Sequence, residues 1–203
     1  RDGRGLELRW IRSGRRRCDV TAVGGSHGVL AGASHRGGHQ ACGGEGNDGI
    51  YIDGTLDIEW GSYTATAIGG LGDDIISVTG NSYYPREGYT DVVIDGGDGN
   101  DSITVNSAFS TTITTGTGSD TVVLTASQYR KLLSGSQLVR NSDGSETAIT
   151  PEPFVITDFS TGVGGDLIDY GELLNNATTS YDGSNPFSTG FLSLVQKSKS
   201  LSI

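Results

Sequence analysis

Short runs in which apolar and polar residues alternate, each directly after a glycine-rich segment, are the recurring pattern of this chain. The middle residue of each run is a large aliphatic one, and alternation with a period of two is typical of a strand with one buried face. The segments and runs align without gaps as GGEGNDGIY (43–51), GGLGDDIIS (69–77), GGDGNDSIT (96–104) and TGTGSDTVV (115–123). The aliphatic residues are Ile50, Ile76, Ile103 and Val122. The pattern predicts a repeated turn and strand with these side chains stacked in a core.

The spacing of the repeats predicts how the chain is wound. The glycine-rich segments begin at residues 43, 69, 96 and 115, so the steps between them are 26, 27 and 19 residues. Two repeat units, about 18 residues, complete one rung of a flattened parallel coil, and the longer steps carry insertions such as 81–89. The prediction is an all-β fold, a parallel β-roll (β-solenoid) with all four turns on one edge. The opposing strands would present Ala67, Ile94 and Ile113 to the core.

The turn residues have the chemistry of a cation site. Glycine stands at positions 2 and 4 of every turn and at position 1 of the first three, and aspartate stands at position 6 of all four. Glycine adopts backbone angles that direct several carbonyl oxygens to one point, and carbonyl and carboxylate oxygens are the ligands of calcium. The residues expected to bind Ca²⁺ are Gly44, Gly46, Asp48, Gly70, Gly72, Asp74, Gly97, Gly99, Asp101, Gly116, Gly118 and Asp120.

Stacking the turns would place four aspartates in one column. Adjacent strands lie about 4.8 Å apart. At that distance neighbouring carboxylates repel by roughly 1 kcal/mol in water and by roughly 3–4 kcal/mol at an effective dielectric constant near 20. Asp73, Asp95 and Asp98 add to the negative charge. The edge should therefore close only around cations shared between successive turns, about three ions for four turns, so calcium binding and folding are expected to be one event.

Charge divides the chain near residue 42. Residues 1–42 carry eight Arg against three acids, whereas residues 43–203 carry six Lys or Arg against 21 acids, for a net charge of −10. An acidic body argues against nucleic acid as a partner, because phosphates require a basic surface. No apolar run is long enough to span a membrane. We expect a basic, Gly/Arg-rich leader over 1–42 without order of its own, and the calcium-binding roll over 43–125.

The remaining segment, residues 126–203, is expected to cover the end of the roll, as the open end of a stacked repeat requires. Thr125 and Gln128 form a T-x-x-Q capping box before an apolar pair. In such a box the two side chains satisfy each other's main-chain N–H groups, which starts a helix. The motif predicts a short capping helix at about 126–133, followed by a C-terminal cap.

The repeats resemble the RTX, or hemolysin-type calcium-binding, family over about residues 43–125. FVITDFSTGVGGDLIDYGELL (154–174) is similar to the block that follows the roll in type I-secreted RTX proteins, and DGSNPFSTGFLSLVQ (182–196) resembles the region downstream of it. The resemblance implies a secreted, extracellular bacterial protein, exported by the type I secretion machinery. KSKSLSI (197–203) departs from the family, because it is basic and does not continue the expected strand-rich tail.

Two further aspartates in the C-terminal block have two interpretations. Asp166 and Asp169 lie beside Gly164 and Gly165. They could form an additional calcium site, or they could solvate a turn and cap the helix predicted for the GELL sequence that follows. The sequence leaves both interpretations open.

Two other constellations occur in the leader. GGSHG (24–28) fits the G-x-S-x-G elbow of lipases, with Ser26 as nucleophile, but no histidine after residue 42 completes a triad, and chance is the better explanation. A zinc site is a second alternative, because H-x3-H-x2-C has workable spacing. Its ligands would be Cys18, His35, His39 and Cys42. No H-E-x-x-H motif occurs, and we expect no catalytic residue in this chain.

The expected function is calcium ion binding coupled to folding outside the cell. Extracellular calcium modules often bind in the range of roughly 0.1–1 mM, so such a chain would stay unfolded before export and fold afterwards. Two other classes are kept beside this one. The chain could be the noncatalytic C-terminal part of a secreted hydrolase (a protease or lipase), or a fragment of an adhesin or surface layer with a cell-surface or glycan partner.

Overall fold

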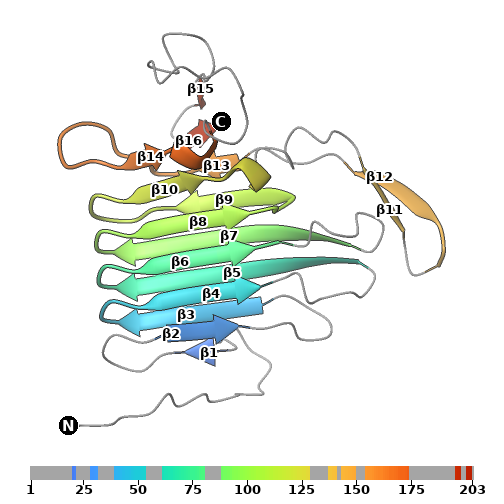
Figure 1. Cartoon of the computed structure of the whole chain (residues 1–203), viewed down its shortest axis with the longest axis horizontal. Coiled ribbons are helices and arrows are strands. Elements are labelled where there is room, and N and C mark those ends of the chain that lie inside the picture. The colour runs from blue at the N-terminus through green and yellow to red at the C-terminus, as the bar shows by residue number, and fades with distance from the viewer. Residues whose placement is uncertain are drawn as a thin grey trace.

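Two large β-sheets make up most of the protein (Figure 1). The computed structural model describes residues 20–21, 28–31, 39–53, 61–80, 88–128, 137–140, 143–149, 154–173, 195–197 and 200–202. The first sheet has the order β1 (Val20–Thr21), β3 (His39–Glu45), β5 (Gly61–Leu71), β7 (Gly88–Asp98), β9 (Ser110–Thr114), β13 (Phe154–Ile156), β16 (Ser200–Ser202) and β15 (Val195–Lys197). The second has the order β14 (Leu167–Asp169), β10 (Thr121–Leu124), β8 (Ser102–Asn106), β6 (Ile75–Thr79), β4 (Gly49–Asp53) and β2 (Gly28–Ala31).

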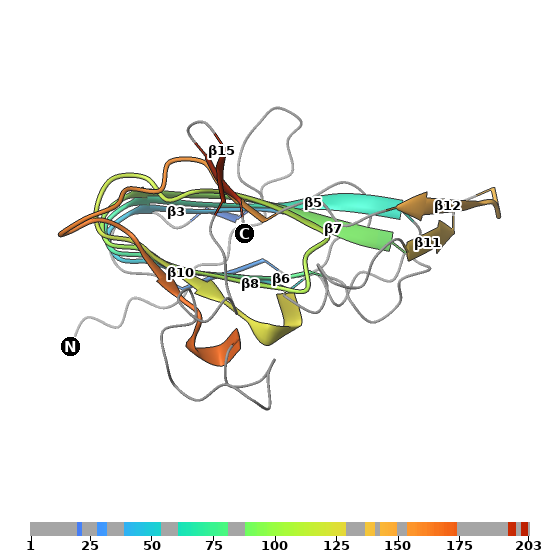
Figure 2. The same cartoon turned by 90° about the horizontal axis from the view of Figure 1, so that it is seen from above.

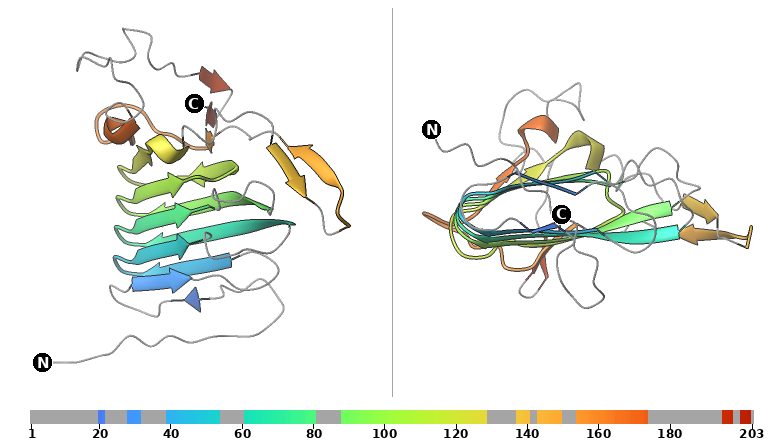
Figure 3. Two further views of the ribbon diagram at one scale, coloured as in Figure 1. Left: turned by 45° about the vertical axis from the view of Figure 1, so that its right-hand side comes forward. Right: turned by 90° about the horizontal axis from the view of Figure 1, so that it is seen from below.

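From β1 to β10 successive strands alternate between the two sheets, which face each other as two layers (Figure 2). Pairing is parallel throughout the second sheet and from β1 to β13 in the first, whereas β13–β16 and β16–β15 are antiparallel. We use "rung" for a strand of the first sheet, the turn after it and the next strand of the second sheet. Figure 3 shows the rungs stacked in chain order, from blue at one end to orange at the other. The all-β class predicted from the sequence is confirmed in this form, as two largely parallel sheets with little helix.

The core lies between the two layers and consists of aliphatic side chains in register. Ile50 pairs with Ile76, Ile76 with Ile103, and Ile103 with Val122 across the second sheet, and all four are fully buried. Ala67, Ile94 and Ile113 align in the same way across the first sheet. The predicted apolar columns are confirmed, because a parallel register holds the same repeat position on the same face of every strand.

The leader is not separate from the sheets, and the boundary predicted at residue 42 falls inside β3. The short strand β1 pairs with β3, and β2 continues the second sheet beyond β4, with Val29 opposite Ile50. The described parts of the leader, residues 20–21, 28–31 and 39–42, are thus paired strands, and the expectation of a leader without order stays a prediction for the rest. The basic charge marks a change in composition. It does not predict strand pairing, because strands pair through main-chain N–H and carbonyl groups.

The predicted capping helix begins where expected, and residues 126–128 are helical. The N–H of Gln128 donates to the Thr125 hydroxyl at 3.1 Å, which is one half of the capping box. The Gln128 side chain instead makes two hydrogen bonds to the main chain of Ala108. Its Oε1 accepts the Ala108 N–H at 2.8 Å, and its Nε2 donates to the Ala108 carbonyl at 3.1 Å. The rest of the predicted helix, 129–133, lies outside the described residues.

The C-terminal region adds to the end of the stack. β13 and β14 form the rung after that of β9 and β10, with Ile156 opposite Ile113 and Ile168 opposite Val122. The tail also forms short strands, which was not expected from its departure from the family pattern: β15 and β16 extend the first sheet. A hairpin of β11 (Gln137–Arg140) and β12 (Glu146–Ile149) projects from the body on the right of Figure 1. Among the described residues no helix is long and apolar enough to cross a membrane.

Candidate metal centre

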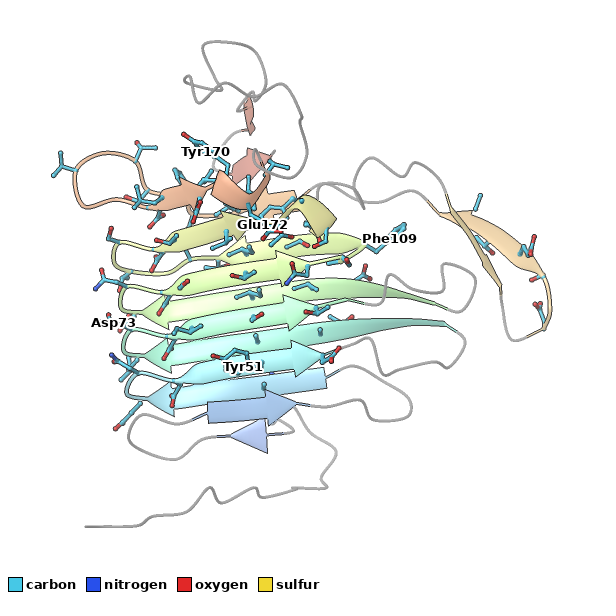
Figure 4. All side chains as sticks on the ribbon, in the orientation of Figure 1. Tyr51, Asp73, Phe109, Tyr170 and Glu172 are labelled. Carbon is cyan, nitrogen blue, oxygen red and sulfur yellow. The ribbon has the colours of Figure 1, made fainter. Side chains whose placement is uncertain are left out.

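The glycine-rich turns lie along one edge of the stack, at the left of Figure 4, where Asp73 marks the second turn. The strand register aligns them directly, with Gly44 opposite Gly70 and Gly70 opposite Gly97. Position 4 of each of the first three turns donates its N–H to the position-3 carbonyl of the next turn, as in Gly72 to Asp98 at 2.7 Å. The glycines at positions 2 and 4 have φ between 99° and 139°, a region closed to most side chains: Gly44, Gly46, Gly70, Gly72, Gly97, Gly99, Gly116 and Gly118.

The position-6 aspartates form a continuous buried column. Each donates its N–H to Oδ1 of the aspartate one rung further on: Asp48 to Asp74 at 2.7 Å, Asp74 to Asp101 at 2.8 Å, Asp101 to Asp120 at 2.8 Å, and Asp120 to Asp166 at 3.1 Å. The four predicted aspartates are between 0% and 3% exposed. Carboxylates that accept main-chain N–H groups are held in one orientation, so the column is rigid.

In three of these aspartates the second carboxylate oxygen has no hydrogen-bond donor among the described residues. The Oδ2 atoms of Asp74, Asp101 and Asp120 are buried and accept no hydrogen bond from the part of the chain that the structure describes. Burial, with neighbouring carboxylates adding to it, raises the pKa of Asp74 and raises the pKa of Asp101 and Asp120 to about 6. A buried charge without a partner is costly, so each group must take up a proton or a cation.

The position-1 glycines show where a cation would fit. Gly43, Gly69 and Gly96 do not have positive φ, so their backbone conformation does not require glycine. Steric crowding requires glycine there, because a β-carbon at Gly43 would lie 2.5 Å from the Gly69 carbonyl oxygen and 2.7 Å from Asp48 Oδ2. A β-carbon at Gly96 would meet the Thr115 carbonyl oxygen and Asp101 Oδ2. Each position thus opens onto a carbonyl of the next turn and a carboxylate of its own turn.

The atoms around these openings that could bind a metal ion are all oxygens. Nowhere in the described residues do three or more His, Cys, Asp or Glu side chains gather as a metal-ligating group. A cation on this edge would therefore take main-chain carbonyls in addition to the aspartates, which is the ligand mixture that calcium accepts and that zinc or copper does not prefer. The unsatisfied Oδ2 atoms and the openings at position 1 fit a hard divalent cation.

Position 5 of the turns forms a second ladder that the sequence analysis missed. The N–H of Asp73 donates to Asn47 Oδ1 at 3.0 Å, that of Asn100 to Asp73 Oδ1 at 2.7 Å, and that of Ser119 to Asn100 Oδ1 at 3.0 Å. These bonds run from one rung back to the previous one, opposite in direction to those of the aspartate column. The repeat motif specifies no residue at position 5, yet all four residues there carry a short side chain with an acceptor oxygen.

The two aspartates of the C-terminal block have different roles. Asp166 is the fifth member of the column, at the position opposite Asp120, and its Oδ2 accepts the N–H of Ser160 at 2.7 Å. Asp169 is exposed and its Oδ1 accepts the N–H of Gly171 at 2.9 Å, where residues 171–173 turn into a helix. The capping interpretation therefore holds for Asp169, and the two do not share one site.

The alternative sites of the leader find no support. Ser26, Cys18 and His35 lie outside the described residues. The lipase elbow needs a helix after its serine, but β2 follows as a strand. Cys42 is disulfide-bonded, so it has no thiolate to offer to zinc.

The raised pKa values predict an unusual acid dependence in the absence of metal ions. Because the folded-state pKa of Asp101 and Asp120 is about 6 and the ordinary value is 3.8, the folded protein holds protons between those pH values that the unfolded chain has lost. Stability without metal should therefore fall as the pH rises from about 4 to 6, whereas paired carboxylates give the opposite slope. The β-signal in circular dichroism, recorded at pH 4.5 and 7.0 in the presence of a chelator, measures the fraction of folded chain. A stronger signal at pH 7.0 would contradict this prediction.

Comparison of the chain with protein-family models, with curated protein sequences and with solved structures finds no match. The assignment of function therefore depends on the residues and geometry of the turn edge: five stacked aspartates, buried carboxylate oxygens without donors, and glycines that leave room for an ion.

Proposed function

We propose that the protein is a calcium-binding parallel β-roll, with calcium ions held between successive glycine-rich turns and with folding coupled to calcium binding outside the cell. The observation that carries the proposal is the set of Oδ2 atoms of Asp74, Asp101 and Asp120, which are buried, accept no hydrogen bond and lie along one column. Oxygen atoms in that state are ready ligands, because binding a cation removes the cost of their burial.

Each ion would lie between two turns and take oxygens from both. At the first interface the candidates are Asp48 Oδ2 and the Gly69 carbonyl, which both face the opening at Gly43, and Asp74, whose Oδ1 accepts the Asp48 N–H. Equivalent sets occur at the next two interfaces, which gives three ions for the four predicted turns. A bound divalent cation would neutralise the two carboxylates and tie successive rungs together.

Coupling to folding follows from the column. Without cations, neighbouring buried carboxylates repel and are poorly solvated, so the edge opposes closure of the stack. An ion that binds only the stacked turns stabilises them by mass action. Calcium is scarce inside cells and abundant outside, so this coupling supports export of an unfolded chain and folding afterwards. The resemblance of 154–174 to the block after RTX repeats supports type I secretion and an extracellular location. The proposal assigns the chain no catalytic residue.

Circular dichroism during a calcium titration tests the proposal. We expect little β-signal in a chelator and a cooperative rise of that signal in the range of roughly 0.1–1 mM free calcium. Magnesium at the same concentration serves as the control, because its strict octahedral geometry suits carbonyl-rich sites poorly. An equally strong β-signal in the chelator would contradict coupled folding, and unchanged spectra together with no heat of calcium binding in calorimetry would contradict calcium binding itself.

A further inference from the structure

The fourth turn differs from the first three at position 1, where Thr115 replaces glycine. Thr115 is fully buried and lies opposite Gly96, one strand beyond it in the first sheet. In the first three turns a β-carbon at this position would collide with the next turn's carbonyl and with a carboxylate oxygen. Thr115 has that β-carbon, so the structure beyond the fourth turn must be different.

The segment beyond it is a longer turn. The register of β13 with β9 and of β14 with β10 places Asp158 opposite Thr115 and Asp166 opposite Asp120. Residues 158–166 span nine positions where the other turns span six. The three additional residues let the chain take a different path over the fourth turn, and this path accommodates the threonine side chain.

Hydrogen bonds occupy the carboxylate oxygens of Asp158 and Asp166, which the fifth turn brings to this interface. Oδ1 of Asp158 accepts the Thr115 N–H at 2.8 Å and lies 3.0 Å from the Thr115 hydroxyl, and its Oδ2 accepts the Gly116 N–H at 2.9 Å. Oδ2 of Asp166 lies 3.3 Å from the same hydroxyl and accepts the Ser160 N–H at 2.7 Å. Both carboxylates of the fifth turn are thus satisfied by donors of the chain itself, whereas Oδ2 of Asp74, Asp101 and Asp120 accepts no hydrogen bond from the described residues.

We propose that Thr115 closes the interface between the fourth and fifth turns to cations, so that this interface is joined by hydrogen bonds alone while the three lower interfaces each hold an ion. The inference rests on the proposed calcium-binding function and adds to it a residue that sets the number of ions. The Thr115 β-carbon fills the position that Gly43, Gly69 and Gly96 leave open, and its hydroxyl binds Asp158 and Asp166, the two carboxylates of the next turn.

The difference between the last interface and the three lower ones affects how the stack assembles. Four interfaces have the same column of aspartates, but only at the last do the carboxylates of the next turn have additional donors that join the two turns. The rungs of the fourth and fifth turns can therefore stay together in a chelator, whereas the lower rungs need calcium to close.

Counting bound calcium in three proteins tests the inference. Equilibrium dialysis at saturating free calcium, followed by elemental analysis, should give three ions for the wild type. Thr115→Gly removes the β-carbon and the hydroxyl and should bind one ion more. Thr115→Ala removes the hydroxyl but keeps the β-carbon and should bind the same number as the wild type, so it separates filled space from lost hydrogen bonds.

Each result decides the matter. A fourth ion in the wild type, equal counts for Thr115→Gly and the wild type, or an additional ion in Thr115→Ala would overturn the inference and leave calcium binding intact. Absence of bound calcium from all three proteins would instead refute the proposed function. If Thr115→Gly does not fold, the wild-type count still decides, because three ions support the closed interface and four refute it.

Discussion

Asparagine in place of Asp101 should stabilise the protein without calcium and destabilise it with calcium. Asp101 Oδ1 accepts the Asp74 N–H at 2.8 Å, and the amide oxygen of asparagine can keep that bond. The substitution removes the charge of a carboxylate whose second oxygen is buried without a donor. In a chelator at pH 7 that charge opposes folding, so its loss should raise the fraction of folded chain, measured as the β-signal in circular dichroism. With calcium it is a ligand to two interfaces, so its loss should weaken binding tenfold or more, about 1.4 kcal/mol.

Two matched variants separate the carboxylate from its surroundings. Asp101→Ala also removes the acceptor, and the buried Asp74 N–H then loses its partner at a cost of about 1–3 kcal/mol, so this variant should be less stable in both conditions. Asp143→Asn changes an exposed carboxylate on the projecting hairpin and should leave calcium affinity unchanged. If Asp101→Asn and Asp101→Ala lose the same stability in the chelator, the buried charge is not the feature that calcium relieves.

The parts of this structure that follow a fixed repeat position could be predicted from the sequence. Ile50, Ile76 and Ile103 lie in one column because a parallel register carries the same position from rung to rung. Insertions change the length of a step but leave the turn and its strand intact, so the turn edge was predictable too. The aspartate column follows for the same reason.

The parts that break the repeat could not be predicted in this way. Asp166 joins the column although the turn before it is longer and lacks the glycine spacing of the others, so the sequence marks it beside Gly164 and Gly165 but leaves its role open. β1 and β2 pair through main-chain groups, which composition does not report. The bond from Asn100 to Asp73 crosses rungs at position 5, where the motif names no residue. A column of short polar side chains at that position was the available signal.

Alanine in place of Gly97 should prevent the stack from closing. Gly97 has a φ of 103°, and a β-carbon there would collide with the carbonyl oxygen and carbonyl carbon of Gly70 in the previous turn. The unfavourable backbone angle costs about 1–2 kcal/mol. The collision is with main chain that is itself hydrogen-bonded to its neighbours, so it cannot be relieved by rotating a side chain. We expect a total loss of about 3 kcal/mol or more, measured as the change in unfolding free energy at saturating calcium.

Gly162→Ala isolates the backbone contribution. Gly162 has a similar φ of 111°, but no atom of the described structure lies within 4 Å of a β-carbon placed there. Its cost should therefore be the angular strain alone, about 1–2 kcal/mol, with normal calcium affinity. The difference between the two variants measures how closely successive turns approach. Equal losses would mean that glycine at position 2 is needed only for its backbone angle and that the turns are not packed against each other as the structure shows. A larger loss for Gly97→Ala, accompanied by weaker calcium binding, ties the close approach of the turns to the ions between them.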